Sequence, residues 1–156
     1  MSFLLRALTE TQQASPTLPA MKLAALVALL ALKAPLPGVV TPSGNIHCFY
    51  VPGPPGHLVC DIHQAAYSKR EQDGCMARAG LDWHGWEVYA TRKTVPVCSG
   101  GILYNSNTGY PKYTKLAYGK TWRFAAFTCT SRFTGLTCTT KTGHGIFISR
   151  ASWRGW

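Results

Sequence analysis

The sequence predicts a small all-β domain, an antiparallel sandwich or barrel that three disulfides hold closed. Only 14% of the 156 residues are charged, while 15 glycines and 10 prolines supply many turns. Short apolar stretches recur between these turns about every 8–12 residues, which is typical of small sandwiches and barrels. Six cysteines, an even number, indicate a disulfide framework. We expect about seven or eight short strands, with one short helix possible.

Residues 1–38 are predicted to be a leader that contains a signal peptide, with translation beginning at Met21. Met21-Lys22 carries a positive charge, Leu23 to Leu32 are ten apolar residues, and a proline-rich stretch follows. A buried core helix is the alternative for this segment. Ten apolar residues are too few to cross about 30 Å of hydrocarbon, so we expect no membrane span. Residues 39–156 are then one domain, secreted or held in the cell envelope.

The first structural unit is predicted to be a hairpin. Asn45 to Val51 alternates apolar and polar residues, as does His57 to Ile62. Pro54-Pro55-Gly56 between them favours a turn. Cys48 and Cys60 both fall on the apolar side of their strands, and eleven residues separate them. A bridge between these cysteines would staple the hairpin.

The middle of the chain is less regular. Residues 64–78 can form a short helix that ends at a glycine. Trp86 to Ala90 and Thr94 to Val97 are predicted to be a strand pair, and residues 99–112 a polar, aromatic loop. A short strand is expected over Lys115 to Tyr118.

The last third repeats the plan of the first hairpin. Thr121 to Thr130 is predicted to be one strand, and Arg132 to Gly135 a turn. Leu136 to Thr140 returns, Gly143-His144-Gly145 turns again, and Ile146 to Arg150 forms the last strand.

Six cysteines allow 15 pairings, and spacing alone does not choose among them. The hairpin argument favours Cys48–Cys60 and Cys129–Cys138, which leaves Cys75–Cys98 by elimination. Each closed loop would stabilise the fold by about 2–3.5 kcal/mol in the chain-entropy model.

No metal, cofactor or thiol chemistry is predicted. His57-x-x-Cys60-x-x-His63 has the residue types of a metal cluster, but on a strand both histidines point away from the cysteine. An exported thiol also tends to be oxidised. The sequence contains no C-x-x-C, so redox catalysis has no motif to support it.

No catalytic motif stands out either, and the protein is predicted not to be an enzyme. A secreted nuclease is one alternative, because His84, Glu87, Arg92 and His144 could supply a base, an acid and a cation. Surface histidines are the simpler interpretation. From Val39 onward the chain is basic, but its positive charges are scattered, so a nucleic-acid partner is not expected.

Aromatic residues are the candidate binding surface. If exposed together, they could stack on sugars or contact a protein; if buried, they are core packing. We therefore predict a non-catalytic binding module whose partner, an extracellular protein or a glycan, the sequence does not identify. The candidate residues are Trp83, Trp86, Tyr104, Tyr110 and Tyr113.

The order of motifs resembles an uncharacterised family of exported bacterial domains with six cysteines. The motifs are SGNIxC from Ser43, VCDI from Val59, LxYG from Leu116, FTCxS from Phe127, and then GLTC and GHG. The resemblance implies export and three intramolecular disulfides, and it carries no catalytic residue. Here Ile146 stands where that family usually has a phenylalanine after GHG. A more distant similarity, through residues 107–110 (NTGY), is to small exported lysozyme inhibitors; a cell-wall enzyme inhibitor is the second alternative.

Overall fold

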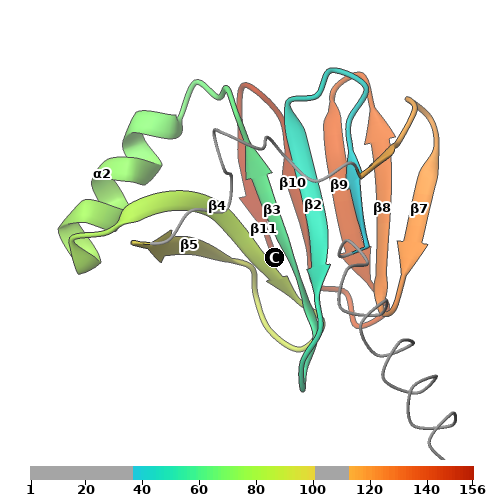
Figure 1. Ribbon diagram of the computed structural model, residues 1–156, viewed down its shortest axis with the longest axis horizontal. Coiled ribbons are helices and arrows are strands. Elements are labelled where there is room, and N and C mark those ends of the chain that lie inside the picture. Colours follow the sequence, from blue (N-terminus) through green and yellow to red (C-terminus); the bar gives the residue numbers. More distant parts are fainter. Residues whose placement is uncertain (1–36, 101–112) are drawn as a thin grey trace, which may run out of the picture. The chain divides into compact units, whose positions relative to one another are not determined.

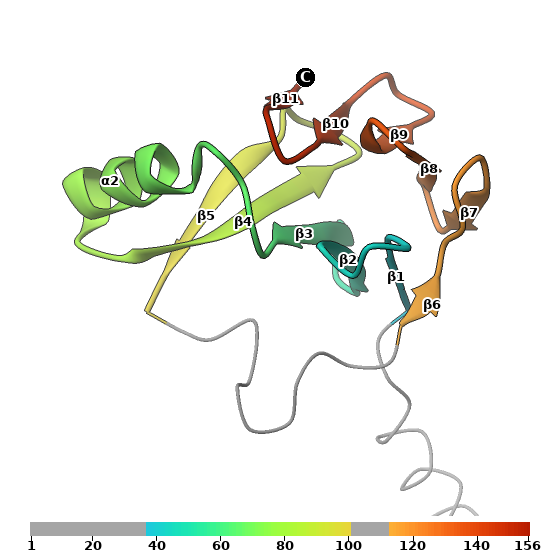
Figure 2. The ribbon, with the colours of Figure 1, turned by 90° about the horizontal axis from the view of Figure 1, so that it is seen from above.

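The computed structural model describes residues 37–100 and 113–156. These belong to one unit, Pro35–Trp156, in which two β-sheets face each other and enclose the core (Figures 1 and 2). The predicted all-β class is confirmed. The first sheet has the order β5-β4-β3-β2-β1-β6 and the second β11-β10-β9-β8-β7. The bounds in the first sheet are β1 Gly38–Val40, β2 Ile46–Val51, β3 His57–Ile62, β4 Asp82–Tyr89, β5 Val95–Ser99 and β6 Thr114–Lys115. Those in the second are β7 Thr121–Phe124, β8 Phe127–Arg132, β9 Gly135–Thr140, β10 Gly145–Ile148 and β11 Trp153–Gly155.

The hairpin β2–β3 forms where the sequence places it. Cys48 lies directly opposite Cys60 across the antiparallel pair, and both face the core because the strands alternate inward and outward residues. A turn leads into β2, with the Gly44 N–H donating to the Thr41 carbonyl at 2.9 Å. The turn and the alternation therefore fix which face of this hairpin is buried.

The single helix of the described residues, α2, runs over Ser68–Ala79 beside β4 and β5 (Figure 2). It ends at Gly80, which adopts the left-handed conformation (φ 63°) that glycine accepts without steric cost. The Cys75–Cys98 bridge ties α2 to β5. The helix is thus an attachment on the edge of the first sheet.

The expectation of one strand over Thr121 to Thr130 is wrong. The chain reverses at Ala125 and Ala126, so that Phe124 lies opposite Phe127 and two strands, β7 and β8, replace one. Ala125 has a φ of 50°, a conformation that costs a residue with a Cβ about 1–2 kcal/mol. This turn contains no glycine, proline, asparagine or aspartate, so the sequence pattern predicted one continuous strand across it.

The end of the chain also differs from the expectation. The last predicted strand, 146–150, is shorter, because β10 stops at Ile148. After a connection in which the Ser149 N–H donates to the Ser152 carbonyl at 2.9 Å, the chain returns as β11. Three strands of two or three residues (β1, β6 and β11) raise the number of strands in the described residues to eleven.

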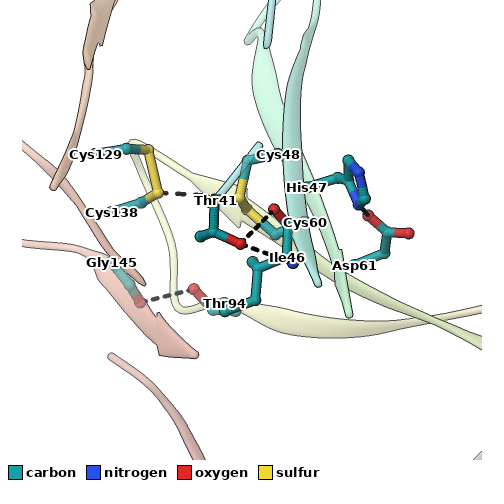
Figure 3. Close-up of a disulfide and its surroundings, with 10 residues drawn as sticks. All are labelled: Thr41, Ile46, His47, Cys48, Cys60, Asp61, Thr94, Cys129, Cys138 and Gly145. Carbon is teal, nitrogen blue, oxygen red and sulfur yellow. Dashed lines mark hydrogen bonds and ion pairs between the residues drawn. A yellow bond between two sulfur atoms is a disulfide. The ribbon is translucent and has the colours of Figure 1, made fainter. Parts of the chain in front are cut away.

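Two disulfides meet in the centre of the sandwich (Figure 3). Cys48–Cys60 joins β2 to β3, and Cys129–Cys138 joins β8 to β9, so each sheet contributes one bridge. All four residues are fully buried, and the Sγ atoms of Cys48 and Cys138 are 4.0 Å apart. Neither sulfur carries a hydrogen, so this is a packing contact between the two bridges. These are the two pairs that the hairpin argument favoured, and the third bridge, Cys75–Cys98, is the pair that elimination left.

Apolar side chains surround the paired bridges on both sheets. Thr94, in the β4–β5 connection, links the sheets from the side by donating its hydroxyl to the Gly145 carbonyl at 2.8 Å (Figure 3). The core therefore consists of the two central disulfides and the apolar side chains around them, and it is small, as expected for a domain of this size. The largest fully buried apolar residues of that shell are Trp86, Phe127, Leu58, Leu136, Ile146 and Ile148.

The central bridges are predicted to stabilise the fold by packing as well as by chain entropy. Chain entropy alone ranks the longer Cys75–Cys98 loop above Cys129–Cys138, at about 3.4 against 2.6 kcal/mol. Replacing Cys129 and Cys138 by alanine also removes two fully buried residues from the central core, whereas of Cys75 and Cys98 only Cys75 is fully buried. We expect that double variant to lose about 1 kcal/mol more free energy of unfolding than C75A/C98A. Urea unfolding measures both, and a larger loss for C75A/C98A would contradict the packing argument.

The strained turn yields a second prediction. A125G should raise the free energy of unfolding by about 0.5–1 kcal/mol, since glycine relieves the positive φ at a smaller cost in chain entropy. Ala126 has no such strain, so A126G is the matched control and should lower stability. Urea midpoints that fall for both variants would show that Ala125 is not strained.

Candidate functional site

A pocket of about 790 Å³ opens at one end of the sandwich, between the two sheets. Five connections meet there: the β1–β2 turn, the chain after β3, the β6–β7 loop, the β8–β9 turn and the β10–β11 loop. In Figure 1 these connections lie toward the upper end of the sheets. Segments up to about a hundred positions apart in sequence therefore build one hollow. The residues used below are Ser43, Asn45, His63, Gln64, Tyr118, Arg132, Phe133, Thr134, Ser149 and Arg150.

The wall on the first sheet is held by a closed set of hydrogen bonds. The Asn45 side chain donates to the Gln64 carbonyl at 3.1 Å and accepts the Gln64 N–H at 2.9 Å. The Thr41 hydroxyl accepts the Ile46 N–H at 3.1 Å, which fixes the turn against the start of β2. These bonds hold the turn against the chain that leaves β3.

The opposite wall is the tip of the β8–β9 hairpin. Phe133 is 88% exposed, and Tyr118, from the β6–β7 loop, is 43% exposed. Their rings are 5.5 Å apart and inclined at 66°, an edge-to-face pair. Arg132 stands beside Phe133 and is also exposed. The hairpin below the tip is closed by Cys129–Cys138, so these side chains project from a fixed base.

The β10–β11 loop forms the third side. The Tyr67 hydroxyl donates to the Ser149 carbonyl at 2.9 Å, and the Ala66 N–H donates to the Arg150 carbonyl at 2.8 Å. The Arg150 guanidinium donates to the Gln64 side-chain oxygen at 3.2 Å. This loop is therefore bonded to the segment that leads into α2.

The charge of the pocket is positive. Arg132 and Arg150 line it, and no aspartate or glutamate is among the described residues of its lining. His63, also in the lining, lies near His47, with ring centroids 5.4 Å apart. Burial of His47, and then the proximity of His63, lower the pKa of His47 to about 4. His47 is consequently neutral at pH 7, and the arginines supply the formal charge.

Two of the predicted aromatic residues lie in and against the core. Trp86 is fully buried, and Trp83 packs against it with ring centroids 5.1 Å apart. Residues three apart on a regular strand point to opposite faces, but a register shift at Gly85 (φ 101°) turns both rings inward. The Trp83 indole N–H donates to the Gly85 carbonyl at 2.9 Å. Trp83 and Trp86 therefore contribute to core packing, which was the alternative to an exposed binding surface.

The other candidate aromatic residues do not join the tryptophans. Tyr113 stacks on Phe49, with ring centroids 5.9 Å apart. Burial and the nearby Asp61 raise the pKa of Tyr113 to about 12. Tyr104 and Tyr110 lie outside the described residues, as does the 107–110 element that resembled the lysozyme inhibitors.

The residues considered for a nuclease are only partly brought together. Glu87 and Arg92 approach to 4.0 Å, and the Tyr89 hydroxyl donates to Glu87 at 2.7 Å. The Arg92 guanidinium lies 3.7 Å over the Tyr89 ring, and burial raises the pKa of Tyr89. His84 instead contacts the Ser99 carbonyl at 2.9 Å, while His144 is in the β9–β10 turn. No hydrogen bond or ion pair in the described residues links either histidine to Glu87 or Arg92.

The sulfur atoms of Cys48, Cys60 and Cys138 lie within 4.8 Å of one another, as metal ligands would. All three are oxidised in bridges, and a metal needs thiolates. His57 of the H-x-x-C-x-x-H pattern instead lies 3.9 Å from Glu87 and stacks on Tyr89. His57 and Cys60 therefore have different surroundings and do not form a metal site together.

Sequence reasoning missed the exposed tip of the β8–β9 hairpin. It treated Arg132 to Gly135 only as a turn. A signal was present, because turns favour small and polar residues and a phenylalanine at a turn centre has no local structural reason. Contiguous exposed apolar surface with a polar rim marks interaction sites, and Phe133 and Tyr118 are two exposed rings that lie side by side.

The described helix is too short and too polar to span a bilayer. No curated protein and no solved structure matched the chain in the comparisons made. The domain family DUF6636, whose function is unknown, matches residues 22–154, which covers most of the sequence. This chain, with its two sheets and three disulfides, belongs to the DUF6636 family of unknown function.

Proposed function

We propose that the protein is an exported, non-catalytic binding module that acts outside the cytoplasm, and that the end pocket is its ligand site. The observation that supports this proposal is that the exposed Arg132 and the 88% exposed Phe133 are neighbours on a hairpin tip beside an open pocket. Exposing a large apolar ring to water is unfavourable by about 1.5–3 kcal/mol relative to burying it. A binding role gives that exposure a reason.

Export is supported by the cysteine chemistry. Every cysteine is paired, and structural disulfides persist in oxidising compartments, whereas the cytosol keeps thiols reduced. The leader predicted in residues 1–38 has the charge and length pattern of a secretory signal. A bacterial source, implied by the family resemblance, is part of the same proposal.

A binding role fits the pocket better than catalysis. His63 is the one histidine of the described lining, and no aspartate, glutamate or cysteine is among the other described residues of that lining. General acid–base chemistry normally needs a second positioned group. Hydrogen-bonded walls and an exposed apolar anchor suit recognition.

Export is tested with the full chain and two matched leucine substitutions. L29R interrupts the apolar core of the predicted signal and should leave the protein unprocessed and inside the cell. L4R lies before Met21 and should change nothing, because we expect translation to begin at Met21. Cell fractionation and N-terminal sequencing provide the readout. Equal export of L29R and wild type would remove the support for an exported module.

The pocket is tested by ligand screening against isotopically labelled protein. Small anionic compounds and short peptides should shift the NMR signals of Ser43, Gln64 and Phe133 together. F133S should weaken those hits, whereas M76S, at an exposed methionine on α2, is the matched control and should leave them unchanged. Hits that cluster away from the pocket, or that survive F133S unaltered, would contradict this location of the site.

A further inference from the structure

Most hydrogen-bonding side chains around the pocket are already engaged. Both polar atoms of the Asn45 amide bond to the Gln64 backbone, and the Gln64 side-chain oxygen accepts from Arg150. The Ser43 hydroxyl oxygen accepts from the Asn45 N–H at 3.3 Å, and the Ser149 hydroxyl donates to the Ser152 carbonyl at 2.9 Å. A sugar, which is recognised by many directed hydrogen bonds, would find few groups available on these walls.

What remains available is charge and apolar surface. The Arg132 side chain makes no hydrogen bond or ion pair with the described residues, and Tyr118 is the one described aromatic ring that pairs with Phe133. Thr134, next to them, is exposed as well. A guanidinium with all its donors free is suited to a carboxylate or a phosphate, which it can hold by two parallel hydrogen bonds.

The two arginines stand on different parts of the rim. Arg132 ends β8 and Arg150 follows β10, and β9 lies between these strands. Strands are spaced by about 4.8 Å, so the two backbones are about 10 Å apart. A single compact anion would engage one guanidinium well, whereas an extended ligand with several anionic groups can engage both.

The inclination of the aromatic pair also restricts the ligand. Bases of single-stranded nucleic acid stack on aromatic faces arranged as successive platforms. The planes of Tyr118 and Phe133 are inclined at 66°, so the two rings do not form successive parallel platforms. A protruding phenylalanine beside an arginine is the kind of anchor that dominates protein–protein contacts.

We propose that the pocket binds an acidic peptide segment of a partner protein, in which an apolar side chain is flanked by carboxylates. The carboxylates pair with Arg132 and Arg150, and the apolar side chain packs against Phe133 and Tyr118. This inference rests on the proposed function and names the ligand of that same site. Complementary charge supports it, because the described lining is positive and free of carboxylates.

Three fluorescent peptides, titrated with the exported form of the protein with its disulfides intact, test this assignment. Their sequences are EEFEE, QQFQQ and EEGEE, and anisotropy titration gives each Kd. The first should bind at least about tenfold more tightly than the other two, since each of those lacks one of the two required features. Its affinity should fall as salt is raised, as expected for exposed charges.

Substitutions then locate the binding. R132Q and F133S should each weaken EEFEE by about fivefold or more. R123Q removes an exposed arginine of β7 outside the pocket, and M76S removes an exposed apolar residue of α2, so both should leave the Kd unchanged. All four sites are exposed, and unchanged thermal unfolding verifies that each variant folds. If R123Q lost as much affinity for EEFEE as R132Q, binding would depend only on the net charge of the protein, and the inference would be wrong.

Two further probes separate failure of this inference from failure of the binding function. An oligogalacturonate supplies carboxylates on sugars, and a single-stranded DNA oligonucleotide supplies phosphates with bases. If either binds in a manner lost in R132Q and F133S while EEFEE does not bind, the pocket is a binding site and the peptide assignment is wrong. If none of the probes binds and the NMR screen finds no ligand at the pocket, both proposals fall.

Discussion

The contact between two disulfides in the interior is the constraint on which the rest of this structure depends. Each bridge joins directly opposed residues of one hairpin, so each fixes the register of its strands. A shift of one residue would turn the apolar side chains of a hairpin outward, and the bridge forbids that shift. Because Cys48 also packs on Cys138, the two fixed hairpins fix each other across the sheets. A small apolar shell is then sufficient to complete the core.

The pocket inherits its shape from these two hairpins. The turn before β2 forms one wall, and the chain reaches Cys48 only two residues after Ile46. The opposite wall is the tip enclosed between Cys129 and Cys138. In the proposed binding role, the backbone of such short, closed connections loses little conformational freedom when a ligand binds, which favours affinity. Under the proposed binding role, the distribution of free and engaged polar groups around the rim determines which ligands the pocket can recognise.

Local patterns in the sequence were sufficient for the fold class, and less so for its details. The alternation around Cys48 and Cys60 predicted β2 and β3 closely, and a glycine predicted the end of α2. The reversal at Ala125 was missed because its residues do not favour turns. The shared orientation of Trp83 and Trp86 depends on a bulge that alternation does not describe. The pocket could not be predicted, since its five segments meet only after both sheets form.

The position of Arg132 and Phe133 inside a covalently closed loop bears on how the molecule would respond to proteolysis. A trypsin-like enzyme that cuts after Arg132 would sever the chain in the middle of the proposed recognition tip. The bridge between Cys129 and Cys138 would still hold the two pieces together. One cleavage would therefore disrupt the proposed site without releasing a fragment, and only reduction would separate the two pieces.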